Sequence, residues 1–153
     1  MKVSLGEINN SLAALRTLAS LKFPARVAYR LGRVLKTAES EVADFKRIND
    51  ETVRRLGAPV KPPPDKDGNL PPEEAWGWQV TPENMAQFVA EITEFLDEQI
   101  ELWGDPLPLE LLGDVQIEPQ VLANLDWLID GGEQADAQGL VNGKATEAEA
   151  HPN

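Results

Sequence analysis

Cysteine is absent from this sequence, and histidine occurs once, as His151 in a polar C-terminal segment. Without cysteine there are no disulfides, no thiolate metal ligands and no cysteine nucleophile. A single histidine outside the apolar part of the chain excludes Ser-His-Asp catalysis on a rigid scaffold and histidine-rich metal sites. These absences predict a protein that is not an enzyme and that uses no cofactor or metal ion.

Long apolar runs are also absent, since none approaches the ~20 residues of a membrane-spanning helix. The first residues contain one Lys and then a helix-capping pattern, which is unlike a secretory signal. Gly-rich phosphate loops of the G-x-x-x-x-G-K or G-x-G-x-x-G type do not occur. We therefore expect a cytoplasmic protein that does not associate with a membrane.

Positive charge is scarce and unevenly distributed. The 153 residues include 14 Lys+Arg and 26 Asp+Glu, for a net charge of −12. Residues 1–64 hold 12 of the basic side chains and 6 of the acidic ones, so the remainder of the chain is strongly acidic. A molecule this acidic does not attract duplex nucleic acid over long distances, but a local basic patch can still bind a small anion. The two parts of the chain can also attract each other, within or between subunits.

Two helices are predicted in the first part of the chain. Ser4 and Glu7 have the spacing of a capping box, which begins a helix that ends near Ser20 to Leu21. A second helix is expected over 24–56, from Pro24 to the stop signal Gly57. Its single apolar stripe runs for about 50 Å and needs a partner along its whole length. We therefore expect a homo-oligomer that forms through helix 24–56.

The second part of the chain is predicted to be less regular. Residues 58–80 are rich in proline and form an extended connection, with a short strand or extended segment at 76–80. Further helices are expected over 82–103 and 119–130, and a short strand over 115–117. The predicted fold class is all-α: a helical bundle with one long helix, a small extended hairpin and a disordered acidic tail. Residues 1–132 would form a single domain and 133–153 the tail.

The most informative pattern is a basic stripe at the start of the long helix. Arg26, Arg30 and Arg33 lie within roughly 60° of one another on a helical wheel, with Tyr29 beside them and Lys22 just before. No acidic residue occurs between Glu7 and Glu39, so no local carboxylate neutralises the stripe. Guanidinium groups suit phosphate oxygens, and tyrosine can stack on a base.

Three interpretations of this stripe remain open. It can be a solvated surface, or pair with the acidic stripe of the next long helix across a bundle or subunit interface. It can bind a nucleotide-like ligand in a pocket that another copy completes. It can also dock an acidic host or viral protein. The candidate ligand-binding residues are Lys22, Arg26, Tyr29, Arg30, Arg33, Trp76 and Trp78.

Two acidic patterns in the sequence are candidate metal sites. The stripe Glu91, Glu94, Glu98 and Glu101 has the helical spacing of a carboxylate site but no histidine beside it, unlike the Glu-x-x-His pairs of di-iron bundles. The turn at 65–69 lacks the glycine and acid spacing of an EF-hand. Neither pattern predicts a metal site.

The order of these segments resembles small bacteriophage and prophage proteins of a domain-of-unknown-function family. The resemblance rests on the segment Leu21–Leu31, the long helix ending at Gly57, a helix opened by Glu83-Asn84-Met85, the 115–117 segment and a final helix with leucines at 122, 125 and 128. It covers about residues 3–130. It implies phage origin, hence the host cytoplasm, and no known enzyme class, and it transfers no site residue.

From the residues and this resemblance together, the expected function is that of a non-catalytic phage accessory protein. It would bind and sequester a small anionic, nucleotide-like ligand, such as a signal of host defence. The alternative is a protein–protein adaptor or assembly chaperone in phage morphogenesis, in which charged surfaces set the register of the partners.

Overall fold

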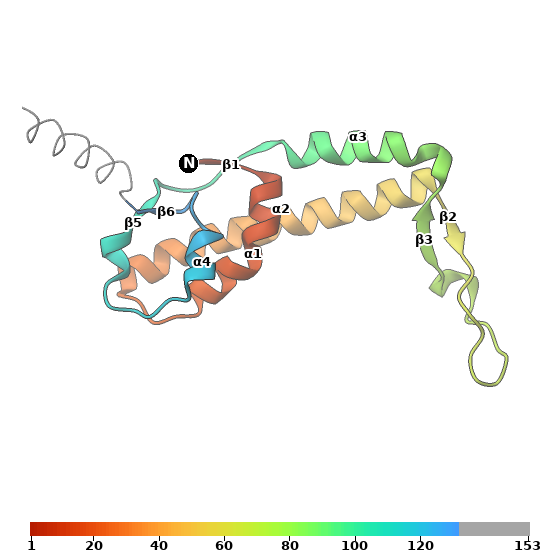
Figure 1. The fold of residues 1–153 in the computed structure, drawn as a ribbon, viewed down its shortest axis with the longest axis horizontal. Helices are drawn as coiled ribbons and strands as arrows, with labels where there is room; N and C mark the ends of the chain where they lie inside the picture. The colour runs from red at the N-terminus through yellow and green to blue at the C-terminus, as the bar shows by residue number, and fades with distance from the viewer. Residues whose placement is uncertain (132–153) are drawn as a thin grey trace, which may run out of the picture. The chain divides into compact units, whose positions relative to one another are not determined.

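The computed structural model describes residues 1–131, of which 56% are helical and 14% are in strands. The prediction of an all-α bundle is therefore wrong: the described chain is mixed α/β, with four helices and small sheets (Figure 1). Each strand has two to four residues, which is too short to show the period-two alternation by which strands are found in a sequence. The predicted tail, 133–153, lies outside the described residues.

The first helix confirms the predicted capping box. Strand β1 (Lys2–Ser4) leads directly into α1 (Leu5–Ala19). The backbone N–H of Glu7 donates to Ser4 Oγ at 3.2 Å, and Glu7 Oε2 accepts from the Ser4 N–H at 3.1 Å. Each side chain therefore satisfies a backbone group that the first turn leaves without a partner.

The long helix α2 (Ala25–Leu56) begins and ends within one residue of the prediction. Its predicted apolar stripe is largely buried, at Val27, Leu31, Val34, Ala38, Val42, Phe45 and Leu56. The helix ends where Gly57 approaches the carbonyl oxygens of Val53 and Gln79, and a Cβ at this position would clash with both. The helix stop is thus fixed by a close backbone contact.

The described chain forms two units, and α1 and α2 each contribute to both. The first unit comprises Met1, Asn10–Leu35 and the residues from Leu102 onward. It contains a short parallel strand pair, β5 (Leu107–Pro108) with β6 (Ile129–Asp130), the 3-10 helix η3 (Leu109–Leu112) and α4 (Pro119–Ala123). Trp127 Nε1 donates to Ser11 Oγ at 3.0 Å. The core of this unit is formed by buried leucines, including Leu15, Leu18, Leu31, Leu102, Leu125 and Leu128.

Two predictions fail in the C-terminal part of this unit. The helix expected over 119–130 has only five residues, and 115–117 is not a strand. The apolar residues 125 and 128 are nevertheless fully buried. The spacing of these residues suggested a helix, but the backbone instead forms successive turns that lead into β6. Leu107 N–H donates to the carbonyl of Leu128, just before this strand.

The second unit comprises Lys2–Asn9 and Lys36–Glu101. After α2, strands β2 (Gly57–Val60) and β3 (Gly77–Val80) pair as an antiparallel hairpin, which the sequence had suggested. Two 3-10 turns, η1 (Glu73–Ala75) and η2 (Pro82–Asn84), flank β3. Helix α3 (Met85–Leu96) then runs beside the second half of α2, where Phe45 stacks on Phe95 with ring centroids 6.0 Å apart (Figure 1).

The third predicted helix is shorter than expected because a strand replaces its last part. The sequence pattern extended this helix to residue 103, but α3 ends at Leu96. Strand β4 (Gln99–Glu101) pairs antiparallel with β1, placing Val3 opposite Ile100, and Leu5 N–H donates to the Glu98 carbonyl. The backbone groups that a longer helix would use are therefore hydrogen-bonded to β1, almost a hundred residues earlier in the sequence.

Among the described residues, no helix is long and apolar enough to span a membrane.

Candidate functional site

The basic stripe lies on the first three turns of α2, in the first unit. The helix begins at Ala25, and the backbone N–H groups of Val27 and Ala28 donate to the Pro24 carbonyl. Val27 and Leu31 are buried, which turns the stripe toward solvent: Arg26, Tyr29 and Arg33 are exposed, and Arg30 is half-buried. Lys22 precedes the helix and is exposed.

Trp103, at the end of the helix expected over 82–103, lies beside this stripe in the structure. Its ring meets Tyr29 edge to face at a centroid distance of 6.4 Å, and Arg33 Cζ lies 5.1 Å from the Trp103 ring centroid. Arg33 Nη1 also donates to the Tyr29 hydroxyl at 3.3 Å. Tyr29 is 62% and Trp103 47% exposed, so both rings remain open to a ligand.

Arg30 packs against the loop that carries Trp103. Gly104 has φ +82°, and a Cβ there would lie 3.1 Å from Arg30 Nη2 and 3.2 Å from Nε. The missing side chain therefore leaves room for the guanidinium. Arg30 Nε is buried and has no hydrogen-bond partner among the described residues. Leaving such a donor unsatisfied costs about 1–3 kcal/mol.

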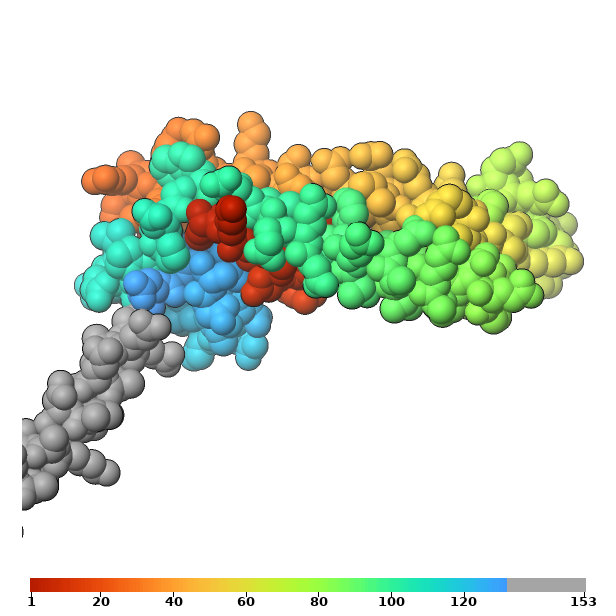
Figure 2. Space-filling view, turned by 90° about the horizontal axis from the view of Figure 1, so that it is seen from above, coloured from red at the N-terminus to blue at the C-terminus, as the bar shows by residue number. Residues whose placement is uncertain are grey.

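The loop is held from the other side by the start of the chain. The Met1 nitrogen donates to the carbonyl oxygens of Leu102, at 2.9 Å, and Gly104, at 2.8 Å. Figure 2 shows the first residues, in red, against the green segment just past residue 100. These contacts fix Trp103 and Gly104 beside α2. We call Arg26, Tyr29, Arg30, Arg33, Trp103 and Gly104 the Arg/Trp cluster.

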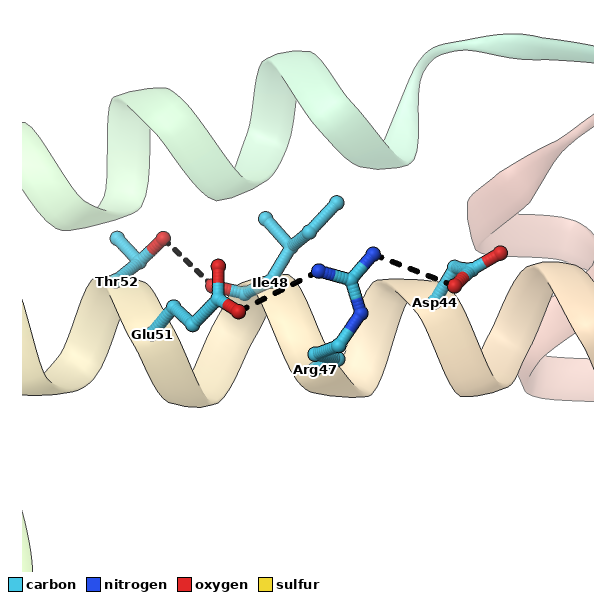
Figure 3. Close-up of polar contacts among 5 residues, drawn as sticks. All are labelled: Asp44, Arg47, Ile48, Glu51 and Thr52. Atoms are coloured by element: carbon cyan, nitrogen blue, oxygen red, sulfur yellow. Dashed lines mark hydrogen bonds and ion pairs between the residues drawn. The ribbon is translucent and has the colours of Figure 1, made fainter.

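The charges of Arg26 and Arg30, two members of this cluster, are not balanced by carboxylates of the described residues, unlike the charge of Arg47 on the same helix. Arg47 lies 3.4 Å from both Asp44 and Glu51, one turn to either side (Figure 3). Within residues 1–131, by contrast, neither Arg26 nor Arg30 forms an ion pair. Arginines at this spacing repel one another by a few tenths of a kcal/mol per pair. The cluster therefore has unused capacity for an anion.

The remaining predicted ligand-binding residues are placed elsewhere. Trp76 and Trp78 belong to the second unit, whereas the cluster is defined within the first unit. Trp76 Nε1 donates to the Pro71 carbonyl at 3.0 Å, and Trp78, 42% exposed, stands opposite Pro59 in the hairpin. Lys22 lies four residues before Arg26 and makes no ion pair among the described residues.

Sequence reasoning missed Trp103 and Gly104 because it continued the third helix as far as Trp103, whereas α3 ends at Leu96. The signal that could have located them is local: Gly104, Asp105 and Pro106 follow Trp103 directly, and this run stops a helix and favours a turn. A tryptophan just before such a turn is more easily exposed than one inside an apolar helix face.

The acidic stripe lies in the second unit and is only partly paired. Glu91 forms an ion pair with Arg55 and accepts from Gln87 Nε2 at 2.9 Å. The hydrogen bonds from Arg55 and Gln87 hold the pKa of Glu91 below its ordinary value of 4.5. A cleft of about 410 Å³ beside it is lined by Glu91, Glu94, Phe95, Asp97 and Glu98. In the part of the chain that the structure describes, no group of acidic or histidine side chains is arranged to hold a metal ion.

Comparison of the chain with models of protein families, with curated proteins and with solved structures finds no match. The function therefore has to be argued from the cluster itself.

Proposed function

We propose that the protein binds a small anionic, nucleotide-like ligand at the Arg/Trp cluster and sequesters it without converting it. The observation that carries this proposal is Arg30: it is held against Gly104, its Nε is buried without a partner, and no carboxylate of residues 1–131 pairs with it. An anionic ligand at the solvent-facing part of this half-buried guanidinium would supply the negative charge that the described residues do not.

The cluster combines the two chemistries that a nucleotide presents. The guanidinium groups of Arg26 and Arg30 can donate charge-assisted hydrogen bonds to phosphate oxygens. The exposed rings of Tyr29 and Trp103 offer faces on which a base can stack. These side chains include no carboxylate, imidazole or thiol that could act as a general base or nucleophile, which supports binding without conversion of the ligand.

The resemblance of the sequence to phage proteins supports the biological context of this proposal. A phage accessory protein that removes a host nucleotide signal needs affinity and abundance rather than turnover. Self-association along helix 24–56 stays a prediction that accompanies it.

The test is isothermal titration calorimetry with a panel of linear and cyclic nucleotides, followed by recovery of the ligand. We expect saturable binding and an intact ligand. Arg30→Gln should weaken binding about 10- to 100-fold, because a hydrogen bond to a charged group contributes ~1.5–3 kcal/mol. Arg47→Gln is the matched control, because Arg47 lies on the same helix but is already paired with carboxylates. The affinity of this variant for the nucleotide should be unchanged. Equal affinity of both variants and the wild type would place the site elsewhere.

A second candidate is the adaptor function, and the composition of the same cluster favours it. Trp, Tyr and Arg are the residues that most often dominate protein–protein binding energy. The first unit also exposes Leu109 (42%) and Leu111 (48%). If no nucleotide in the panel binds, and an acidic virion protein binds with an affinity that Trp103→Ala reduces, the adaptor function replaces the proposal.

A further inference from the structure

Charge is segregated in this chain far more sharply than its net charge indicates. Residues 10–35 contain five basic side chains and no acidic one, whereas residues 81–101 contain six acidic side chains and no basic one. Opposite charge on two exposed surfaces is the complementarity that selects and orients binding partners.

Both charged surfaces retain side chains that the described residues leave unpaired. On the basic side these are Lys22, Arg26 and Arg30, and on the acidic side Glu94, Asp97 and Glu98. The acidic groups surround the cleft beside Phe95, a half-buried ring, in the second unit. In Figure 2 helix α3, in green, lies uncovered on the face shown. Glu94, Asp97 and Glu98 are exposed, so the acidic cleft is open to a cationic partner.

We propose that the Arg/Trp cluster of one copy docks on the acidic cleft of a second copy, and the reverse, in a symmetric dimer. A two-fold axis repeats every contact, so a pair of complementary patches on one chain is used twice. Three unpaired basic side chains would then oppose three unpaired carboxylates in each contact. The exposed Tyr29 and Trp103 rings would add apolar area to each of them.

This contact has a regulatory consequence, which rests on the proposed function. The second copy covers the same guanidinium groups that bind the nucleotide. Ligand and partner therefore compete, and the nucleotide dissociates the dimer. A pocket completed by the second copy would behave in the opposite way, because its ligand would stabilise the dimer.

The experiment measures molecular mass by sedimentation equilibrium for the full chain and for two charge-reversed variants. One variant carries Lys22→Glu and Arg26→Glu, and the other Glu94→Arg and Glu98→Arg. All four positions are exposed, so both variants should fold, which circular dichroism checks. The wild type should be dimeric at low salt and shift toward monomer at 0.5 M NaCl, where the Debye length is only ~4 Å.

Each reversed variant alone should be monomeric, because both of its contacts then bring like charges together. An equimolar mixture of the two should recover the dimer, since both contacts are then complementary. Arg47→Glu, which changes charge on α2 outside the two patches, should stay dimeric. A monomeric wild type, or a dimer that both reversals leave intact, overturns the proposal.

Adding ADP or cyclic di-GMP, whichever binds in the calorimetric panel, separates this proposal from the proposed function. A shift from dimer to monomer supports the competition. A wild-type monomer that binds nucleotide, or a dimer that nucleotide stabilises, refutes this inference while the proposed function stands. A charge-dependent dimer that binds no nucleotide keeps the docking contact and refutes the proposed function.

Discussion

Replacing Gly104 with alanine tests the packing of Arg30 on which the site depends. Two effects act together at this position. The backbone has φ +82°, where a non-glycine residue costs about 1–3 kcal/mol. The added Cβ would also lie 3.1 Å from Arg30 Nη2, so the guanidinium must move. We expect a loss of about 2 kcal/mol of unfolding free energy, or about 4–8 °C in Tm for a chain of this size.

Gly68→Ala is the matched control for the backbone effect. Gly68 has nearly the same φ, +79°, but a Cβ there meets nothing within 4 Å. Its loss should be about 1 kcal/mol, since only the backbone is strained. The effect of the clash is measured by making Gly104→Ala in an Arg30→Ala background. There the loss of unfolding free energy caused by Gly104→Ala should fall to that caused by Gly68→Ala.

Urea unfolding followed by circular dichroism measures all these variants, and the pairwise term comes from the double-mutant cycle. If Gly104→Ala costs the same with and without the Arg30 side chain, the guanidinium does not rest on this glycine and the description of the site is wrong. In nucleotide titrations, Gly104→Ala should weaken binding, whereas Gly68→Ala should not.

Two further predictions concern stability away from the site. Ser4→Ala removes the hydroxyl that accepts from the Glu7 N–H and should cost about 1 kcal/mol in urea unfolding, whereas Ser20→Ala, beyond the end of α1, should cost less. Arg55 lowers the pKa of Glu91, so this pair stabilises the fold above the ordinary carboxyl pKa, and its contribution is lost as pH falls through the lowered value. Glu91→Gln should therefore reduce the stability difference between pH 6 and pH 3; an unchanged difference would show that the pair has no part in acid sensitivity.

Local signals predicted the first two helices well. The Ser4–Glu7 box and the sustained apolar stripe of α2 each contain enough information within a few turns to determine a helix. The strands were harder to predict because their partners are remote: Lys2 pairs with Glu101, and Leu107 with Ile129. Such remote pairings override a local helical pattern, and nothing in the nearby sequence predicts them.

The candidate site was predicted only in part for the same reason. The basic residues and Tyr29 lie on one helix, so their spacing was sufficient to group them. Trp103 and Gly104 reach α2 through tertiary packing and through the Met1 contacts with their loop. Trp76 and Trp78 were predicted as ligand-binding residues, but they lie in the other unit, and no local spacing links them to the stripe on α2.

The central claim is that the Arg30 guanidinium is available for an external anion, and its Nε–Hε resonance tests this most directly. The Nε–Hε signal in a nitrogen–proton correlation spectrum can be assigned from its loss in Arg30→Lys. The account predicts that this signal shifts on addition of the bound nucleotide and saturates with the calorimetric affinity. An Arg30 Nε–Hε signal that does not move while a nucleotide binds would contradict the account.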